Sequence, residues 1–138
     1  MLSIAEITQS LSNLSEDEKH GFDYDCQVIP GEVEVLQINI EGREELPIFL
    51  SISDEQILCI CYLWGENEVN EETRAKMIDS MLDMNIPMPL SSFAKIDDKY
   101  VIFGALARNS AIEEIAHELE ILSDNALEAI TALSEYLV

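Results

Sequence analysis

The sequence predicts an α+β domain in which a mainly antiparallel sheet carries its helices on one face. The expected order is a helix, three or four strands, a helix, two strands and a final helix. Apolar and polar residues alternate in closely spaced segments between residues 22 and 64, as in an antiparallel meander. Apolar residues recur at helical spacing near residues 3–14, 70–84 and 110–137. The 138 residues suit one domain, residues 1–138, with a single core.

The first helix is expected to run from Ser3 to about Leu14. Ser3 and Glu6 have the spacing of a capping box, in which each side chain accepts the backbone N–H of the other residue. The polar segment 15–21 then ends the helix.

Four strand candidates follow, at residues 22–29, 33–41, 46–53 and 56–64. Short turn-forming segments separate them, such as Pro30-Gly31. The second segment places Leu36, Ile38 and Ile40 on one side, and the third places Leu46, Ile48, Leu50 and Ile52 on one side. The fourth is apolar on both sides, which is typical of a central strand covered on both faces.

A second helix is expected at residues 70–84, and the segment Ile86-Pro87-Met88-Pro89 cannot continue it. Two short strands follow at residues 93–96 and 99–106.

The last helix is expected to open with a capping box of Ser110 and Glu113. The polar residues Ser123-Asp124-Asn125 are expected to break or recap it before it continues toward residue 137.

The charge of the chain restricts its partners. The sequence has 28 acidic and 7 basic residues, and its formal net charge is -21. Such a charge disfavours nucleic acid and anionic membranes, and it favours a protein or another cation-bearing ligand. No export signal or membrane-spanning segment is visible in the sequence, so we expect a cytoplasmic protein with no direct membrane insertion.

One acidic segment has part of the pattern of a calcium-binding loop. Asp23, Asp25, Gln27 and Glu34 mimic four of its ligand positions, but Val28 occupies the position that requires glycine. The same segment alternates like a strand, and we favour the strand.

Cysteine and histidine are the other candidates for chemistry. Cys59 and Cys61 share one face of a strand, and with Cys26 and His20 or His117 they could in principle hold zinc. The paired C-x-x-C spacing is absent, so buried structural thiols are the favoured interpretation. We therefore predict no catalytic residue, no metal site and no cofactor.

The fourth and last strands suggest an interaction surface, because they offer more apolar faces than three helices on one side of a sheet can cover. An uncovered face would be apolar with an acidic rim and could bind a partner or a second copy of the chain. The candidate residues are either Leu58, Ile60, Tyr62, Trp64, Tyr100 and Ile102, or those of the opposite face, Ile57, Cys59, Cys61, Leu63, Val101 and Phe103. Coverage of this patch by a helix or loop is the alternative.

The element order, size and acidity resemble the type III secretion chaperone fold. The segment Asn85–Phe93 and the following hairpin at Lys95–Gly104 resemble the uncharacterised bacterial YjfI-like family. The resemblance extends over nearly the whole chain. This resemblance implies no established activity and no catalytic residues. It also implies an accessory role beside a membrane-remodelling protein similar to phage-shock protein A.

These observations favour a non-enzymatic cytosolic protein-interaction or chaperone-like module, expected to be a homodimer. One alternative is a small enzyme that uses scattered carboxylates or a Cys–His pair, which would require a deep pocket of converging titratable groups. The other is an acidic mimic of nucleic acid, suggested by the charge alone.

Overall fold

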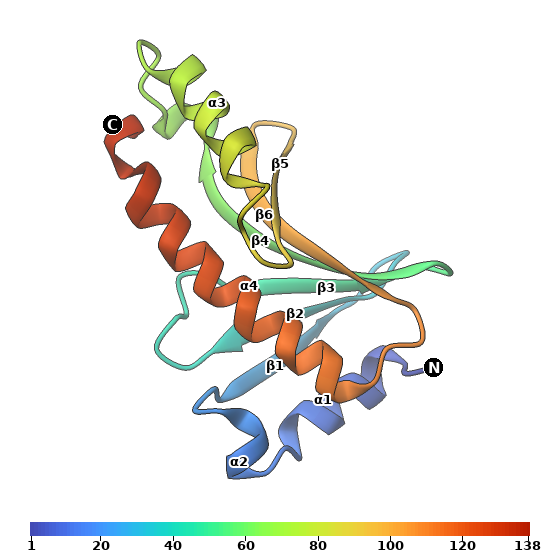
Figure 1. Ribbon diagram of the computed structural model, residues 1–138. Coiled ribbons are helices and arrows are strands. Elements are labelled where there is room, and N and C mark those ends of the chain that lie inside the picture. Colours follow the sequence, from blue (N-terminus) through green and yellow to red (C-terminus); the bar gives the residue numbers. More distant parts are fainter.

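The computed structural model describes residues 1–138 and has the α+β fold that the sequence predicts (Figure 1). The strands are β1 (Tyr24–Ile29), β2 (Val35–Ile40), β3 (Ile48–Ile52), β4 (Gln56–Gly65), β5 (Ser92–Ile96) and β6 (Lys99–Ala107). The helices are α1 (Ile4–Ser12), α2 (Glu16–Lys19), α3 (Arg74–Met84) and α4 (Ile112–Leu133). Short 3-10 turns lie at Glu66–Glu68 and Ser134–Tyr136.

The six strands form one sheet in the order β1-β2-β3-β4-β6-β5, and every neighbouring pair is antiparallel. The first four strands make a meander, as expected. The chain then passes through α3 and returns as the β5–β6 hairpin, which places β6 beside β4 and leaves β5 at the edge. The two longest strands, β4 and β6, therefore pair with each other, and each has a neighbouring strand on both sides.

Two capping boxes organise the N-terminal region. The expected one is confirmed, because Glu6 donates its backbone N–H to Ser3 Oγ (3.1 Å) and Ser3 donates its own to Glu6 Oε1 (3.2 Å). The polar segment after α1 contains a second box between Ser15 and Glu18, and this box starts the short helix α2. From the sequence, this segment was expected only to end α1.

The long helix α4 runs without interruption, so the expected break at residues 123–125 is wrong. Ser123 and Asn125 are buried and bond to distant parts of the chain. Arg43 donates to Ser123 Oγ (2.8 Å), and Asn125 Nδ2 donates to the carbonyl of Pro89 (2.9 Å). Such side chains do not compete for their own helix backbone, and they leave the helix intact.

The expected capping box of Ser110 and Glu113 is wrong, because the N-cap of α4 is Ala111, whose methyl side chain has no acceptor for such a box. Ala111 donates its backbone N–H to Glu114 Oε1 (3.1 Å), whereas Ser110 Oγ donates to the carbonyl of Ala107 (2.8 Å).

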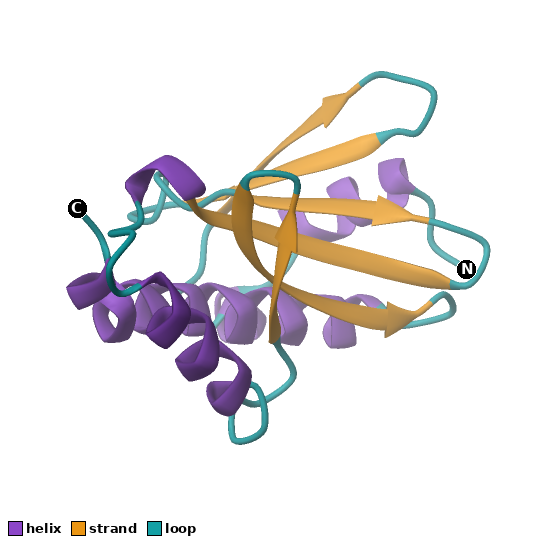
Figure 2. Cartoon of the chain, turned by 90° about the horizontal axis from the view of Figure 1, so that it is seen from above, coloured by secondary structure: helices purple, strands orange, loops and turns teal.

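The hydrophobic core lies between the helices and one face of the sheet (Figures 1 and 2). Each fully buried Ile, Leu or Met that the helices add to this cluster contributes roughly 1.5–3 kcal/mol of hydrophobic stabilisation. Its most buried members include Ile7 of α1, Met77 of α3, Ile115, Leu119 and Leu122 of α4, and Leu36, Ile38, Ile48, Leu50, Ile57, Cys59 and Ile102 of the sheet. Because α1, α3 and α4 all contribute to one cluster, they cover the same face, which we call the helix face. We call the opposite face of the sheet the open face.

A bulge in β4 changes the direction of its side chains near the end of the strand. The register with β6 shifts between Tyr62 and Trp64, so one extra residue, Leu63, interrupts the alternation. Trp64 then pairs with Tyr100, and both belong to the helix-face core. Even-numbered residues of β4 therefore lie on one face before the bulge and on the opposite face after it.

Candidate protein-interaction face

The open face carries apolar side chains over three neighbouring strands. In the antiparallel register, Phe49 of β3 lies opposite Ile60 of β4, and Ile60 lies opposite Phe103 of β6. In the adjacent row, Tyr62 pairs with Val101. Residues directly opposite in an antiparallel pair share a face. We call the following residues the apolar strip: Phe49, Leu58, Ile60, Tyr62, Val101 and Phe103.

Burial separates this strip from the helix face. Ile57 and Cys59, whose side chains point to the helices, are 0% exposed, whereas their neighbour Leu58 is only half-buried. Tyr62 is 41% exposed, and its ring meets that of Phe49 edge-on with centroids 5.8 Å apart. Four members of the strip are half-buried and Tyr62 is exposed, whereas Val101 is 1% exposed beneath its neighbours although it lies outside the helix-face core cluster.

Each of the two candidate residue sets was expected to lie on one face of the sheet, but each is split between the open face and the helix face. Of the first set, Leu58, Ile60 and Tyr62 are on the open face. The other members, Trp64, Tyr100 and Ile102, are in the helix-face core. Of the second set, Ile57, Cys59 and Cys61 are in the core. Val101 and Phe103 are on the open face, and Leu63 is the extra residue of the bulge.

This correction follows from the pairing of β4 with β6. Tyr62 lies opposite Val101 rather than Ile102, so even-numbered residues of β4 share a face with odd-numbered residues of β6. The bulge then moves Trp64 to the other face. Apolar residues of β3, β4 and β6 share the open face, but they come from both sets, and Phe49 belongs with them.

On the helix face, Trp64 and Tyr100 adjoin a group of ionic contacts around Glu66. The carboxylate of Glu66 accepts bonds from Arg74 of α3, from Lys95 of β5 (2.9 Å) and from the hydroxyl of Tyr100 (2.9 Å). The bonds from Arg74 and Lys95 are the main reason that its pKa is lowered to about 2. This arrangement joins α3 to the β5–β6 hairpin and is structural in character.

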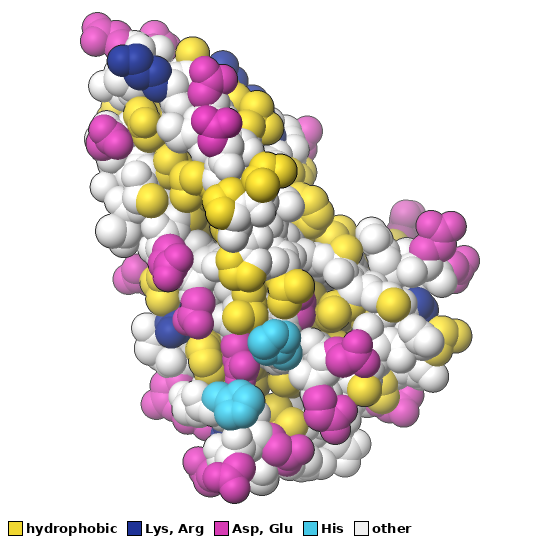
Figure 3. Space-filling view, viewed as in Figure 1, with side chains coloured by type: hydrophobic (Ala, Val, Ile, Leu, Met, Phe, Trp, Pro, Cys, Tyr) yellow, Lys and Arg dark blue, Asp and Glu magenta, His cyan; other side chains and the backbone are white.

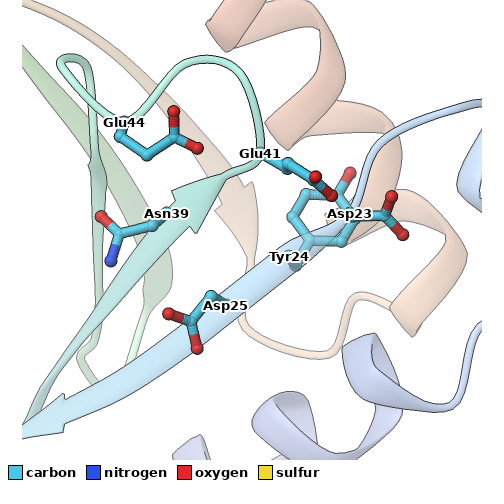
Figure 4. Close-up of a pocket in the computed structure, with 6 residues that line it drawn as sticks. All are labelled: Asp23, Tyr24, Asp25, Asn39, Glu41 and Glu44. Atoms are coloured by element: carbon cyan, nitrogen blue, oxygen red, sulfur yellow. The ribbon is translucent and has the colours of Figure 1, made fainter.

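The open face becomes polar toward β1 and β2. There, a pocket of about 520 Å³ is lined by Asp23, Tyr24, Asp25, Asn39, Glu41 and Glu44. Figure 4 shows Asp25 and Asn39 on neighbouring strands, with Glu44 on the loop that follows β2. Asp25 and Asn39 are direct cross-strand partners. Sequence reasoning missed this pocket because it needs both the β1–β2 register and the position of the loop after β2.

The segment considered as a calcium loop is a strand with a turn. Asp25 and Gln27 lie on β1, Asp23 directly precedes it, and Glu34 lies beyond the β1–β2 turn. In this structure, no group of three or more His, Cys, Asp or Glu side chains is arranged to hold a metal ion.

The three cysteines are unpaired and face the core. Cys59 and Cys61 are buried and Cys26 is half-buried. Burial raises the pKa of the Cys26 thiol to about 11 and that of Cys61 to about 12. Burial likewise raises the pKa of the Cys59 thiol.

Both histidines line a different pocket, between α2 and α4, and no cysteine lines it. They are neighbours in the space-filling view, where acidic side chains are spread over the surface (Figure 3). His20 Nδ1 lies 2.7 Å from Glu120 Oε1, which ties α2 to α4.

Comparison with known proteins first gives a family. The profile of DUF2170, described as an uncharacterized protein conserved in bacteria, matches residues 3–137. The chain belongs to the DUF2170 family. The match confirms the expected bacterial family without an assigned activity, but it does not confirm the name YjfI-like. A comparison with curated proteins gave no match.

Solved structures confirm the fold expected of this DUF2170 protein. An uncharacterized protein from Methanothermobacter thermautotrophicus superposes with a TM-score of 0.64 at 14% identity, over 94% of this chain and 96% of that chain. The ExsC–ExsE complex contains a chain that superposes with a TM-score of 0.51 at 14% identity, over 92% of this chain and 90% of that chain. The secretion-chaperone-like fold is thereby confirmed. None of the helices is both long enough and apolar enough to span a membrane.

Proposed function

We propose that this DUF2170 protein is a non-enzymatic, chaperone-like module that binds a protein partner on the open face of its sheet. The observation that carries the proposal is the apolar strip, which lies on the one face of the sheet that no helix covers. A sheet stabilises itself by covering its apolar face with another layer. Here one face has that layer, and the other keeps the exposed Tyr62 and its half-buried neighbours in contact with water.

The composition of the strip supports binding. The centres of protein interfaces are enriched in Tyr and Phe and depleted of charge, and their rims are polar. Tyr62, Phe49 and Phe103 lie at the centre of this face, and the carboxylate pocket lies beside them. The similar ExsC fold was solved as a complex with ExsE, which is a precedent for a protein partner on this architecture.

The cysteines support binding over catalysis. A nucleophilic cysteine requires a lowered pKa and partial exposure. Here burial raises the pKa of all three thiols, and neither histidine shares a pocket with them.

The location and the process are also proposals. Three unpaired cysteines fit a reducing compartment, and we place the protein in the bacterial cytoplasm. Following the resemblance to the YjfI-like family, we propose an accessory role beside a membrane-remodelling protein similar to phage-shock protein A. We also propose that the strip can pair with a second copy of the chain when no other partner is bound.

Site-specific photocrosslinking in living cells tests this function. A photoreactive phenylalanine analogue replaces Tyr62 in the strip, and in a matched variant it replaces Leu127, which is 40% exposed on α4. We expect discrete protein adducts from position 62 and none from position 127. The mass of an adduct separates a second copy of the chain from another protein. Equal crosslinking from both positions would contradict the proposal.

A pair of substitution variants gives the second arm of the test. Ile60→Ser and Tyr62→Ser together remove the centre of the strip without changing the charge of the protein. We expect them to abolish the adducts captured from position 49, where the analogue replaces Phe49. The control pair, Ile86→Ser and Leu127→Ser, removes exposed apolar side chains elsewhere and is expected to leave those adducts unchanged.

A further inference from the structure

The carboxylate pocket beside the apolar strip has more negative charge than the chain itself compensates. Asp23 is paired with Lys19 at 3.0 Å. Asp25, Glu41 and Glu44 line the same pocket and form no ion pair with any residue of the chain. Glu44 Oε2 accepts only the backbone N–H of Gly42, at 2.8 Å. Three like charges around one pocket repel one another, and a cation placed between them would relieve that repulsion.

The pocket is continuous with the apolar strip across the strands of the sheet. Asp25 pairs with Asn39, and the side chain of Asn39 accepts a bond from Gln37 Nε2 at 3.2 Å. Gln37 is in turn the cross-strand partner of Phe49, at the start of the strip. Across the open face, this path of side chains therefore has a carboxylate on β1, amides on β2 and an aromatic ring on β3. Two strand spacings separate its charged and apolar parts, a distance of about 10 Å.

We propose that the open face binds a protein segment in which a Lys or Arg side chain lies about 10 Å from an apolar anchor. This inference rests on the proposed function and specifies the chemistry of the partner. The apolar anchor packs on Phe49, whose ring meets that of Tyr62, and the cation occupies the pocket among Asp25, Glu41 and Glu44. A span of 10 Å corresponds to about three residues of an extended segment.

Charge complementarity selects this occupant. An apolar segment without a base would leave the three carboxylates uncompensated beside the interface. An acidic segment would be repelled, because like charges placed together at an interface cost binding energy. The planar guanidinium of Arg can bond two acceptors at once, and the pocket offers both carboxylates and the amide oxygen of Asn39. We therefore expect Arg to be preferred over Lys.

Selection of short random peptides displayed on phage tests the inference with the full-length chain as bait. Three baits are compared: the wild type, the pocket variant D25N/E41Q/E44Q and the strip variant I60S/Y62S. A fourth bait, D83N/E128Q/E135Q, removes the same number of charges from exposed sites away from the open face. Thermal melts of all four proteins check that each is folded.

For the wild type, we expect enrichment of peptides that combine aromatic or aliphatic residues with Arg or Lys at about three-residue spacing. A synthetic copy of an enriched peptide should bind the pocket variant about fivefold more weakly or worse, which corresponds to the loss of one screened ion pair. Its affinity for the wild type should fall with added salt, and its affinity for the pocket variant should fall less steeply. The charge-matched control should bind like the wild type.

The remaining outcomes contradict either this inference or the proposed function. Enriched peptides that need the strip but show no preference for basic residues overturn this inference and leave the proposed function standing. Enriched peptides that bind the strip variant as well as the wild type, or an absence of any enriched peptide, overturn the proposed function. A wild-type dimer that dissociates in the pocket variant overturns the inference in favour of a second copy of the chain as the occupant.

Discussion

Gly104 of β6 lies directly beneath the carboxyl group of Glu118 of α4. A Cβ atom at position 104 would overlap Oε1 of Glu118 and would lie 2.8 Å from its Cδ. Glu118 is 2% exposed, and its Oε1 has no hydrogen-bond partner in the chain. The absence of a side chain at position 104 thus creates the space that a buried acid occupies between helix and sheet.

Substitution of Gly104 by alanine should destabilise the protein, because the new methyl group competes with Glu118 for the same volume. Overpacking of a core typically costs about 1–3 kcal/mol. The double variant G104A/E118A removes the clash and should recover part of the loss. Urea unfolding of the wild type, both single variants and the double variant measures this coupling. Additive effects of the two substitutions would show that the two residues do not share this space.

Glu118 should also make stability depend on pH. Burial raises its pKa above the ordinary value, against a smaller opposing effect of His117. The folded chain therefore holds this proton more tightly than the unfolded chain does. Its contribution to stability is fully present below the unfolded pKa of about 4.3, and it is lost as the pH rises through the folded pKa.

The variant Glu118→Gln isolates this contribution. The amide keeps the shape of the side chain and cannot ionise, so the variant should gain stability relative to the wild type as the pH is raised from 4 toward neutrality. Unfolding free energies of both proteins across this range give the difference curve. A flat curve would contradict the assignment of a raised pKa to Glu118.

Glu66 should have the opposite pH dependence. Its pKa is lowered to about 2, mainly by the bonds from Arg74 and Lys95. Its stabilising effect is therefore present above the ordinary carboxyl pKa and is lost as the pH falls from about 4.5 toward 2. Because these side chains are partly exposed, Glu66→Gln should lower the Tm near neutral pH by only about 3 °C. Calorimetry at neutral pH and at pH 2 checks this, and the difference should be much smaller at the lower pH.

Much of the fold was predictable because local patterns determine it. Alternation over residues 22–64 identified the meander, and helical spacing identified α1, α3 and α4. The ends of α4 and its supposed break were wrong for a physical reason. Ser123 and Asn125 resemble residues that break helices, but their bonds go to Arg43 and the Pro89 loop, which are far away in the sequence.

The candidate site was predictable only in part. The doubly apolar character of β4 suggested a leftover apolar face and left open whether a helix or loop covers it. Which residues of β6 share that face depends on the pairing of Tyr62 with Val101, and no pattern within a single strand gives that register. The bulge before Trp64 and the approach of the Glu44 loop to Asp25 likewise arise only when the sheet is assembled.

Asn125 should hold the proline-rich loop against α4. Its amide donates to the carbonyl of Pro89 (2.9 Å) and to Ser91 Oγ (3.0 Å), and both Asn125 and Ser91 are buried. Asn125→Ala would leave the buried Ser91 Oγ without this donor, at a cost of about 1–3 kcal/mol, whereas the carbonyl of Pro89 keeps the backbone N–H of Ser91. Hydrogen exchange should then accelerate at the backbone amides of Met88, Leu90 and Ser91. The exposed position Glu128→Ala on the same helix is the control, and it should leave exchange in the loop unchanged.

The cysteines should be unreactive as long as the protein stays folded. Only the thiolate attacks a disulfide reagent. A pKa raised to about 11 leaves Cys26 roughly 100-fold less thiolate near neutral pH than a thiol of pKa 9. Cys59 and Cys61 are both 0% exposed on the helix face of β4, so the reagent reaches them only after unfolding.

Labelling should therefore show slow reaction of Cys26 alone in buffer and rapid reaction of all three thiols in denaturant. In the Cys26→Ser variant, the rate of labelling should equal the rate of unfolding or local opening, and it should rise with urea. Rapid labelling of Cys59 or Cys61 in buffer would show that the helix layer opens over the sheet far more readily than the packing of its core implies.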